Sequence, residues 1–183
     1  MFHVHSFPPV ETPDARVLVL GTMPGKMSLH AQQYYAHPRN SFWRIAGEIL
    51  GFEAGSVYEH RVSSLAASGV ALWDVLQSCS RGGSLDSAID RDSMIFNDFA
   101  AFFARHRAIH RVCFNGAKAE SLYLRHIQPL VASTTEVEYL RLPSTSPAHA
   151  GKSFLEKLGA WSAISPNERL PGHPFSHFTT TTF

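Results

Sequence analysis

Three segments of this chain combine residue types that could bind a phosphate or a planar ring. The first, Gly21-Thr22-Met23-Pro24-Gly25, follows an apolar run and offers backbone amides with little side-chain bulk. Such a loop can approach a ligand closely and donate N–H groups to it, although a tight turn after a strand has the same composition. The segment contains neither the GxGxxG pattern of dinucleotide-binding loops nor the lysine-containing pattern of nucleotide phosphate loops.

The second segment runs from Tyr34 to Trp43 (YYAHPRNSFW) and places aromatic rings, a basic residue and an asparagine just before a helical pattern. An aromatic face in a binding site is a stacking platform for a planar base. Asn40 lies where a helix N-cap would be, and capping is the commoner role of a lone asparagine at such a position. Phe42 and Trp43 are expected in the core.

The third segment, Leu142–His149 (LPSTSPAH), is rich in small hydroxyl residues and prolines. Its side chains and amides could hold phosphates without much charge, through Ser144, Thr145 and Ser146. Lys152 just beyond it, and the start of a following helix, would add positive potential. An ordinary turn rich in serine and threonine is the less specific interpretation.

Four short apolar runs predict buried strands of a parallel sheet, at Arg16–Leu20, Gly69–Trp73, Arg111–Phe114 and Val137–Leu142. Helical patterns are found over Phe42–Leu50, Ile95–Phe103 and Ala117–Ile127, and in a helix that Ser153 and Glu156 would cap. Strands that alternate with helices indicate an α/β fold whose sheet is covered on both faces.

Polar or small residues follow each predicted strand, so the sequence predicts one site built from four strand ends. The glycine loop follows the first strand, Asp74 the second, Asn115 the third and the hydroxyl-rich segment the fourth. Ligands of such sheets bind beyond the carboxyl ends of the strands, where these residues should meet. A side chain that caps a turn after Trp73 is the less specific interpretation of Asp74.

The composition is that of a globular protein of 183 residues, with 44% hydrophobic and 17% charged residues. We expect one domain over residues 1–170 and a loose tail over 171–183, where no periodicity is found. No apolar run approaches the ~20 residues of a membrane-spanning helix, and no signal-peptide pattern is found. Two cysteines cannot form a disulfide framework, so we expect cytoplasmic localisation. A net charge of +1 excludes a polycation but not a local DNA-binding patch.

In this order, GTMPG, YYAHPRNSFW and LPSTSPAH resemble the motifs of the uracil-DNA glycosylase superfamily, and more narrowly of its hypoxanthine-DNA glycosylase branch, also called family 6. The resemblance covers about Arg16 to Ile164. It implies a three-layer α/β/α sandwich around a short four-stranded parallel sheet. It also implies a monofunctional DNA repair enzyme without a cofactor, which we expect to be a monomer. Its substrate would be double- or single-stranded DNA with a flipped, deaminated base, above all the hypoxanthine of deoxyinosine.

The resemblance also implies roles by position. Asn40 would be the catalytic residue, because Met23 stands where many relatives carry an Asp or Asn that activates water. The base-binding residues would be Gly21, Thr22, Met23, Pro24, Tyr35, Asp74 and Asn115, with Tyr35 stacking on the base. The residues that contact phosphates or wedge into the duplex would be Lys26, Ser144, Thr145, Ser146, Ala148, His149 and Lys152.

The chemistry suggests how such residues could suffice. A flipped base loses its bond to the sugar through a cationic, oxocarbenium-like transition state. Asn40 is too weak a base to deprotonate water before the bond breaks, so it would position the water in a strongly dissociative reaction. Hypoxanthine carries a proton on N1 where adenine has a lone pair. An ionised Asp74 would therefore accept a hydrogen bond from hypoxanthine and reject adenine, which we state as a hypothesis.

Other interpretations stay open. The pairs His3/His5 and His106/His110 have spacings that metal sites use, but no cysteine or carboxylate cluster joins them, and we expect no metal. Lys26 could form a Schiff base, although phosphate contact is the favoured role. A glycosylase for uracil or mispaired pyrimidines would carry the same segments, and so would a non-catalytic protein that grips flipped or abasic sites.

Overall fold

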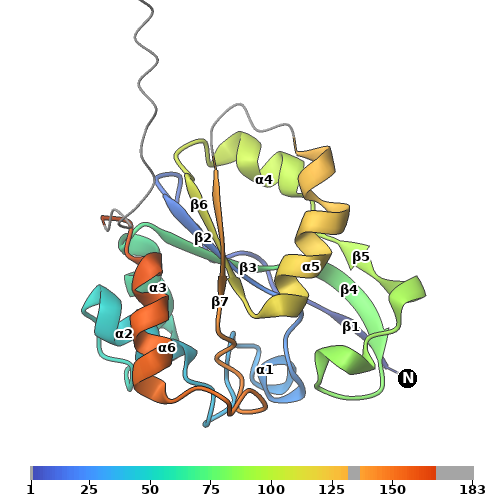
Figure 1. Ribbon diagram of the computed structural model, residues 1–183, viewed down its shortest axis with the longest axis horizontal. Helices are drawn as coiled ribbons and strands as arrows, with labels where there is room; N and C mark the ends of the chain where they lie inside the picture. The colour runs from blue at the N-terminus through green and yellow to red at the C-terminus, as the bar shows by residue number, and fades with distance from the viewer. Residues whose placement is uncertain (1, 132–136, 168–183) are drawn as a thin grey trace, which may run out of the picture.

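The computed structural model describes residues 2–131 and 137–167. Its centre is a parallel sheet of four strands in the order β3-β2-β6-β7 (Figure 1). The strands are β2 (Val17–Gly21), β3 (Val70–Asp74), β6 (Arg111–Asn115) and β7 (Glu138–Leu142). Each strand lies within a residue of the apolar run that predicted it. The predicted four-stranded parallel sheet is therefore confirmed.

Helices cover both faces of this sheet, which confirms the three-layer α/β/α sandwich (Figure 1). In β2, Leu18 and Leu20 belong to one core, whereas Val17 and Val19 belong to the other. The first core is covered by α4 (Phe99–Arg105) and α5 (Ala117–His126), and the second by α2 (Phe42–Leu50), α3 (Tyr58–Ala67) and α6 (Phe154–Trp161). Burial on both faces explains why β2 is a continuous apolar run rather than an alternating one.

Local signals set the ends of two helices as predicted. Ser153 caps α6, because its hydroxyl accepts from the Glu156 amide at 3.3 Å while the Glu156 carboxylate accepts from the Ser153 amide at 2.8 Å. Gly51 ends α2 in the left-handed conformation, with φ of 78°. Phe42 and Trp43, 0% and 4% exposed, lie in the core as expected.

The helix predicted over Ile95–Phe103 is wrong in its first turn. Ile95 and Phe96 form β5, which pairs antiparallel with β4 (Leu76–Arg81). The helix begins only after Asp98, whose carboxylate accepts from the Ala101 amide at 2.9 Å. This contact satisfies an amide of the first helical turn that would otherwise be unpaired, so the helix starts there.

A second, antiparallel sheet was not predicted. It contains β1 (Phe2–His5), β4 and β5 in the order β1-β4-β5. β4 follows β3 after a single intervening residue, and its polar sequence LQSCSR lacks the apolar run that marks the parallel strands. The connection that follows β4, after Arg81, lies at the carboxyl edge of the parallel sheet.

Short helical elements complete the described chain. The α-helix α1 (Lys26–Ala31) follows the glycine loop. Single 3₁₀ turns occur at η1 (Asp86–Ala88), η2 (Arg91–Ser93), η3 (Gln128–Leu130) and η4 (Ser162–Ile164). Of these, α1 and η1 matter for function, because both border the candidate site described below.

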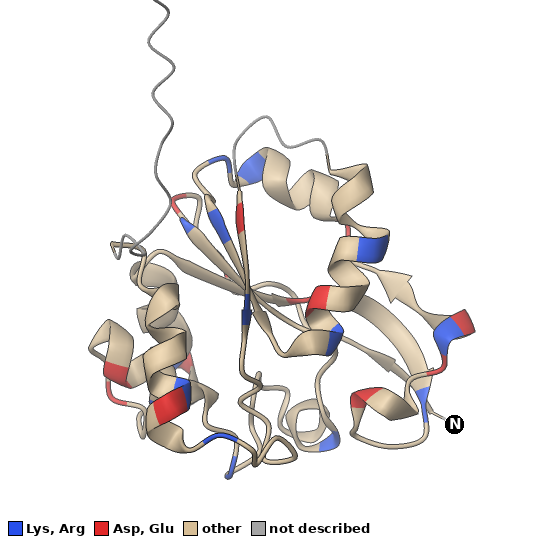
Figure 2. Ribbon diagram, viewed as in Figure 1, with Lys and Arg blue, Asp and Glu red and all other residues tan. Residues whose placement is uncertain are grey.

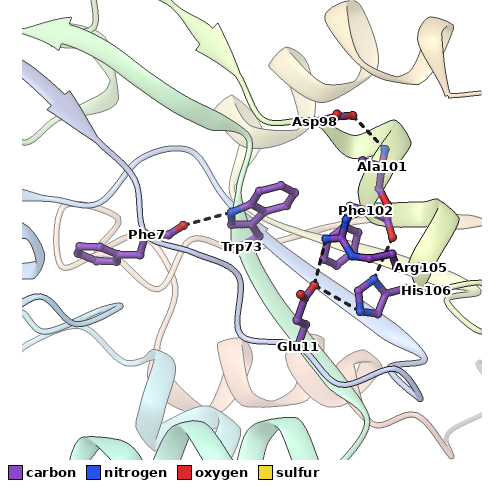
Figure 3. Close-up of polar contacts among 8 residues, drawn as sticks. All are labelled: Phe7, Glu11, Trp73, Asp98, Ala101, Phe102, Arg105 and His106. Atoms are coloured by element: carbon purple, nitrogen blue, oxygen red, sulfur yellow. Dashed lines mark hydrogen bonds and ion pairs between the residues drawn. The ribbon is translucent and has the colours of Figure 1, made fainter.

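The segment between β1 and β2 is fastened to the edge of the parallel sheet and to α4 (Figure 3). The indole Nε1 of Trp73 donates to the Phe7 carbonyl at 3.2 Å. Glu11 lies 3.3 Å from Nε2 of His106, whose Nδ1 donates to the Phe102 carbonyl at 2.9 Å. These contacts fix the N-terminal segment beside β3.

Three expectations from the sequence concern the C-terminal tail, membrane-spanning helices and metal sites. The predicted tail, residues 171–183, lies outside the described residues. Within residues 2–131 and 137–167, no helix is long and apolar enough to cross a membrane. The same part of the chain holds no cluster of three His, Cys, Asp or Glu side chains that could bind a metal ion.

Replacement of Phe102 by alanine tests the core between the sheet and α4. Phe102 is fully buried and packs on Trp73 with ring centroids 5.2 Å apart. We expect Phe102→Ala to lower the free energy of unfolding by about 3–5 kcal/mol in urea denaturation, because the cavity cannot be filled. Leu155, 76% exposed on α6, is the control, and Leu155→Ala should change stability by less than about 0.5 kcal/mol. Equal effects of the two variants would contradict this packing.

Candidate active site at the carboxyl edge of the sheet

A pocket of about 760 Å³ opens at the carboxyl edge of the parallel sheet. Loops that follow the parallel strands line it, together with the segment before α2 and the connection between β4 and β5. The predicted site residues in its wall are Gly21, Thr22, Met23, Pro24, Lys26, Tyr35, Asn40, Asp74, Asn115, Ser144, Thr145, Ser146, Ala148 and His149. Lys152 lies outside the wall, exposed in the turn before α6. Its predicted role, contact with DNA phosphates, does not require a place in the pocket wall and stays a prediction.

Sequence reasoning missed part of the pocket wall. The missed residues are Met27, Ser28, residues 84–87, and Gly25, Tyr34, His37 and Pro147 within the three predicted segments. The first two belong to α1, whose six residues are too few for a clear helical period. Residues 84–87 follow an unpredicted strand in a stretch that is typical of an ordinary loop, so no local signal pointed to them.

The pairing of β2 with β3 brings a carboxyl group against the glycine loop. Gly21 lies opposite Asp74 in the register of these parallel strands. A Cβ atom at Gly21 would overlap Oδ1 of Asp74 and would lie 3.1 Å from the Tyr35 hydroxyl oxygen. Glycine is therefore required here because the protein's own side chains approach the backbone closely. The two sequence interpretations of the loop, close approach of a ligand and a tight turn, did not include this reason.

Asp74 is 3% exposed and is held by a short hydrogen bond. The Ser6 hydroxyl donates to its Oδ2 at 2.6 Å, which argues against a carboxyl that only caps a turn. Burial raises the pKa of the Asp74 carboxyl to about 7, the Ser6 hydrogen bond opposes this rise, nearby Asp86 adds to it and Arg81 opposes it. Near neutral pH, the group is therefore present in both its ionised and its protonated form.

Tyr35 has an uncommon backbone conformation, with φ of 54°. Its ring packs on Phe42 with centroids 4.2 Å apart, and its hydroxyl oxygen is buried. Burial, and then the charge of Asp74, raises the pKa of this phenol well above its usual value. The Asn115 amide is near enough to oppose part of this rise. The hydroxyl nevertheless makes no hydrogen bond of normal geometry with any residue in the described part of the chain.

A second carboxyl enters the pocket from the connection between β4 and β5. The Thr22 hydroxyl donates to Oδ2 of Asp86 at 3.0 Å. Burial raises the pKa of the Asp86 carboxyl, while the Thr22 hydrogen bond and the charges of Arg81 and Lys118 oppose this rise. The pocket thus contains two carboxyls that burial disposes to keep a proton.

Arg81 lies beneath the glycine loop and is 2% exposed. Its Nη2 donates to the Pro24 carbonyl, whereas its Nη1 has no hydrogen-bond partner among residues 2–131 and 137–167. Burial lowers the pKa of this guanidinium, and nearby Cys79, Asp86 and Asp74 oppose the decrease. A buried cation therefore supports the loop from within and compensates part of the negative charge of the pocket.

Asn40 lines the pocket but is not the N-cap of α2. The N-cap is Ser41, and the Asn40 Oδ1 accepts from the Phe42 amide at 3.0 Å. The prediction of the cap is thus wrong by one residue, because this side chain folds back on the first helical residue instead. An amide oxygen has two lone pairs, so Oδ1 can still accept from a water molecule.

The hydroxyl-rich loop is tied to neighbouring elements by polar contacts. The Asn115 side chain donates to the Thr145 hydroxyl at 2.8 Å and accepts from the Thr145 amide at 2.9 Å. The Ser41 amide donates to the Thr145 carbonyl at 3.1 Å. Trp161 of α6 holds the start of the loop through the Pro143 carbonyl, at 2.9 Å. Asn115 therefore both lines the pocket and holds the site together.

Charged residues at the pocket mouth are few. Basic residues lie on loops along the carboxyl edge of the sheet (Figure 2). Lys26 and Arg39 are exposed, and Lys26 lines the pocket.

Met23, 7% exposed, forms part of both the core and the pocket wall and offers no group that titrates. Proton transfer in the pocket must therefore come from other residues.

Asp74 should make stability depend on pH. Its pKa of about 7 in the folded state exceeds the value of 3.8 for a free carboxyl, so the folded protein binds this proton more tightly than the unfolded chain. The free energy of unfolding should therefore fall between pH 4 and pH 7, by up to about 4 kcal/mol. Asp74→Asn should lack this decrease in urea titrations at pH 4.5, 6 and 8. The exposed Asp92→Asn should follow the wild type. Parallel curves for wild type and Asp74→Asn would contradict a proton held by Asp74.

Comparison with known proteins identifies the family. The family model for the uracil DNA glycosylase superfamily matches residues 8–165. A hypoxanthine DNA glycosylase of Methanosarcina barkeri is 36% identical over 114 residues, which cover 62% of this chain and 71% of that protein. One of Methanosarcina acetivorans, also named hypoxanthine DNA glycosylase, is 37% identical over 114 residues with the same coverage.

A solved structure agrees with these sequence relatives. It is a solution NMR structure of a Methanosarcina acetivorans protein described as a candidate uracil DNA glycosylase. The two chains superpose with a TM-score of 0.75 at 31% identity, over 90% of this chain and 98% of the other. The matched range includes every strand of the parallel sheet and the whole pocket wall. This chain belongs to the uracil DNA glycosylase superfamily.

Proposed function

We propose that this protein is a monofunctional DNA glycosylase that removes hypoxanthine from deoxyinosine in DNA. The observation that carries the proposal is the buried carboxyl of Asp74, placed over Gly21 in the wall of the pocket. The names of the two Methanosarcina relatives support the same substrate. Deamination of adenine gives hypoxanthine, so the substrate would be damaged DNA. The protein would bind it as a monomer.

The pocket suits a base that has been rotated out of the duplex. Its volume of about 760 Å³ exceeds that of a purine and leaves room for the sugar and a water molecule. Unstacking a base costs a few kcal/mol, and less for a mispaired one, which favours lesions. In the proposed complex the base lies against the ring of Tyr35, and Asn115 and Thr145 keep the opposite wall in place.

Cleavage in this site would be strongly dissociative. Met23 cannot take a proton, and the Asn40 amide can hold a water molecule but not deprotonate it. The N-glycosidic bond therefore breaks first, and the water adds to the cationic sugar that results. Positioning of this water by Asn40 is the contribution that we assign to its side chain.

The choice of base is assigned to Asp74. In its ionised form the carboxylate accepts a hydrogen bond from N1–H of hypoxanthine. Adenine would face the same oxygen with a lone pair, and an unpaired buried acceptor costs about 1–3 kcal/mol. The Ser6 hydrogen bond of 2.6 Å favours the ionised form that this discrimination needs.

Contacts to the DNA backbone are assigned to the loop after β7. Ser144, Thr145 and Ser146 line the pocket and would hold the phosphates on either side of the flipped nucleotide. Ala148 and His149 are exposed at its rim, where a wedge into the duplex must lie. Lys26 supplies positive charge at the mouth of the pocket, and Lys152, outside the pocket wall, could reach the flanking duplex.

The proposal is tested by strand cleavage. Duplexes with a single inosine, uracil or xanthine are incubated with the protein and then treated with alkali, which breaks abasic sites. We expect breaks at inosine, and a fall of about 100-fold in the single-turnover rate for Asn40→Ala because water is no longer positioned. Asn167→Ala, at an exposed site away from the pocket, is the control. Breaks only at uracil would indicate a uracil glycosylase, and binding without breaks would indicate a lesion-binding protein.

The role of Asp74 is tested with the isosteric amide. Asp74→Asn replaces an acceptor by a side chain that can also donate to N1 of adenine. We expect the ratio of inosine to adenine cleavage rates to fall by about tenfold or more. The reason is that the variant no longer places an unpaired carboxylate against the lone pair on N1 of adenine. Rates are compared on duplexes that differ only in this base. Continued exclusion of adenine by the variant would show that Asp74 is not the discriminating residue.

A further inference from the structure

Asp86 has no part in the function proposed above, yet it is placed as a second carboxyl of the same pocket. Its Oδ2 accepts from the Thr22 hydroxyl at 3.0 Å. Thr22 directly follows Gly21, the residue that the Asp74 carboxyl covers. Both carboxyls line the pocket. The two acids therefore lie against consecutive residues of one loop, in the same part of the wall.

The buried charge around these two acids does not balance when both are ionised. Arg81, 2% exposed, is the buried cation that acts on both of them. Asp74 is 3% exposed and Asp86 is part-buried, so two carboxylates beside this one buried guanidinium leave a negative charge largely removed from water, which is costly and which the part-buried Lys118 opposes only at Asp86. One proton on the pair makes the group neutral. A buried and a part-buried carboxyl that interact in this way lose their protons as a pair.

We propose that Asp74 and Asp86 together hold one proton, and that Asp86 donates it to the departing base. This inference rests on the proposed function. The edge of hypoxanthine presents the N1–H donor beside the O6 acceptor. When the base is bound, Asp74 is ionised and accepts a hydrogen bond from N1–H. The one proton of the pair is then on Asp86, which donates it to O6. Asp86 is thus a catalytic residue of the proposed reaction.

The reaction balances with this proton. The C1′–N9 bond breaks with its electron pair moving to the base, and the Asp86 proton passes to O6. The base then leaves as a neutral tautomer of hypoxanthine instead of an anion, which lowers the barrier to its departure. Water held at Asn40 adds to C1′ through its oxygen. The proton that this water releases returns to the Asp86 carboxylate and restores the pair.

Other titratable groups face the pair from each neighbouring element. They are Tyr34, Tyr35, Cys79 and Arg81, with Lys118 of α5 near Asp86, and Lys26, His37 and His149 line the same pocket. Burial raises the pKa of the phenols and of the Cys79 thiol, which keeps them neutral near pH 7. Arg81 and Lys118 oppose retention of the proton. A decrease in the excision rate at alkaline pH that Asp86→Asn abolishes is therefore assigned to loss of the proton of the pair.

The test is the pH profile of single-turnover excision of inosine by wild type, Asp86→Asn and Asp86→Glu. An asparagine keeps a donor for O6 but has no proton to transfer. We expect Asp86→Asn to be about 100-fold slower at pH 7, as for loss of a general acid, and to lose the alkaline decrease of the wild type. Asp86→Glu should recover part of the rate and the decrease. The exposed Asp92→Asn should match the wild type.

Binding separates a catalytic role from a structural one. Affinity is measured for a duplex with 2′-fluoro-deoxyinosine, which resists cleavage, and we expect Asp86→Asn to bind it within about threefold of the wild type because the amide still donates. If Asp86→Asn has the same rate and pH profile as the wild type, the role of Asp86 is overturned. The proposed function still stands in that case, provided that the wild type excises inosine. A loss of affinity equal to the loss of rate would also overturn it. Absence of inosine cleavage by the wild type would overturn both proposals.

Discussion

The close approach of the Asp74 carboxyl to Gly21 is the constraint on which the site depends. It follows from the register of β2 and β3, which sets these two residues side by side at the carboxyl edge of the sheet. A side chain at Gly21 would overlap the carboxyl, so the glycine, the register and the acid are interdependent. The Ser6 hydroxyl completes the arrangement from the N-terminal segment, which Trp73 holds in place through Phe7.

The remaining walls are assembled by contacts between distant parts of the chain. Asn115 and Ser41 both bind Thr145, and so connect β6 and the start of α2 to the loop after β7. Gly116 adopts φ of 97°, and a Cβ atom there would lie 3.2 Å from Cβ of Ser144. The loop thus packs closely on the end of β6. A pocket built in this way is preorganised, since its polar groups are oriented before a base enters.

The electrostatics of the pocket come from burial more than from net charge. A molecule with net charge +1 can carry a site in which one carboxyl and one guanidinium are buried and a second carboxyl is part-buried. Removal from water is what brings the pKa of Asp74 near 7, because desolvation penalises the charged form. Few cations at the mouth are then needed, since hydroxyls and amides can hold phosphates.

The sequence by itself determined the strands of the parallel sheet and their order along the chain, because strands buried on both faces require continuous apolar runs. It thereby also determined which residues stand at the strand ends. It also determined the capped start of α6, where a local serine and glutamate suffice. Only the tertiary structure decided that Asn40 bonds to Phe42, since backbone geometry selects the cap. It also decided that Asp86 lines the pocket and that Arg81 bonds to the glycine loop at Pro24. Their placement depends on β4, which pairs with segments far away in the sequence and therefore carries no local signal.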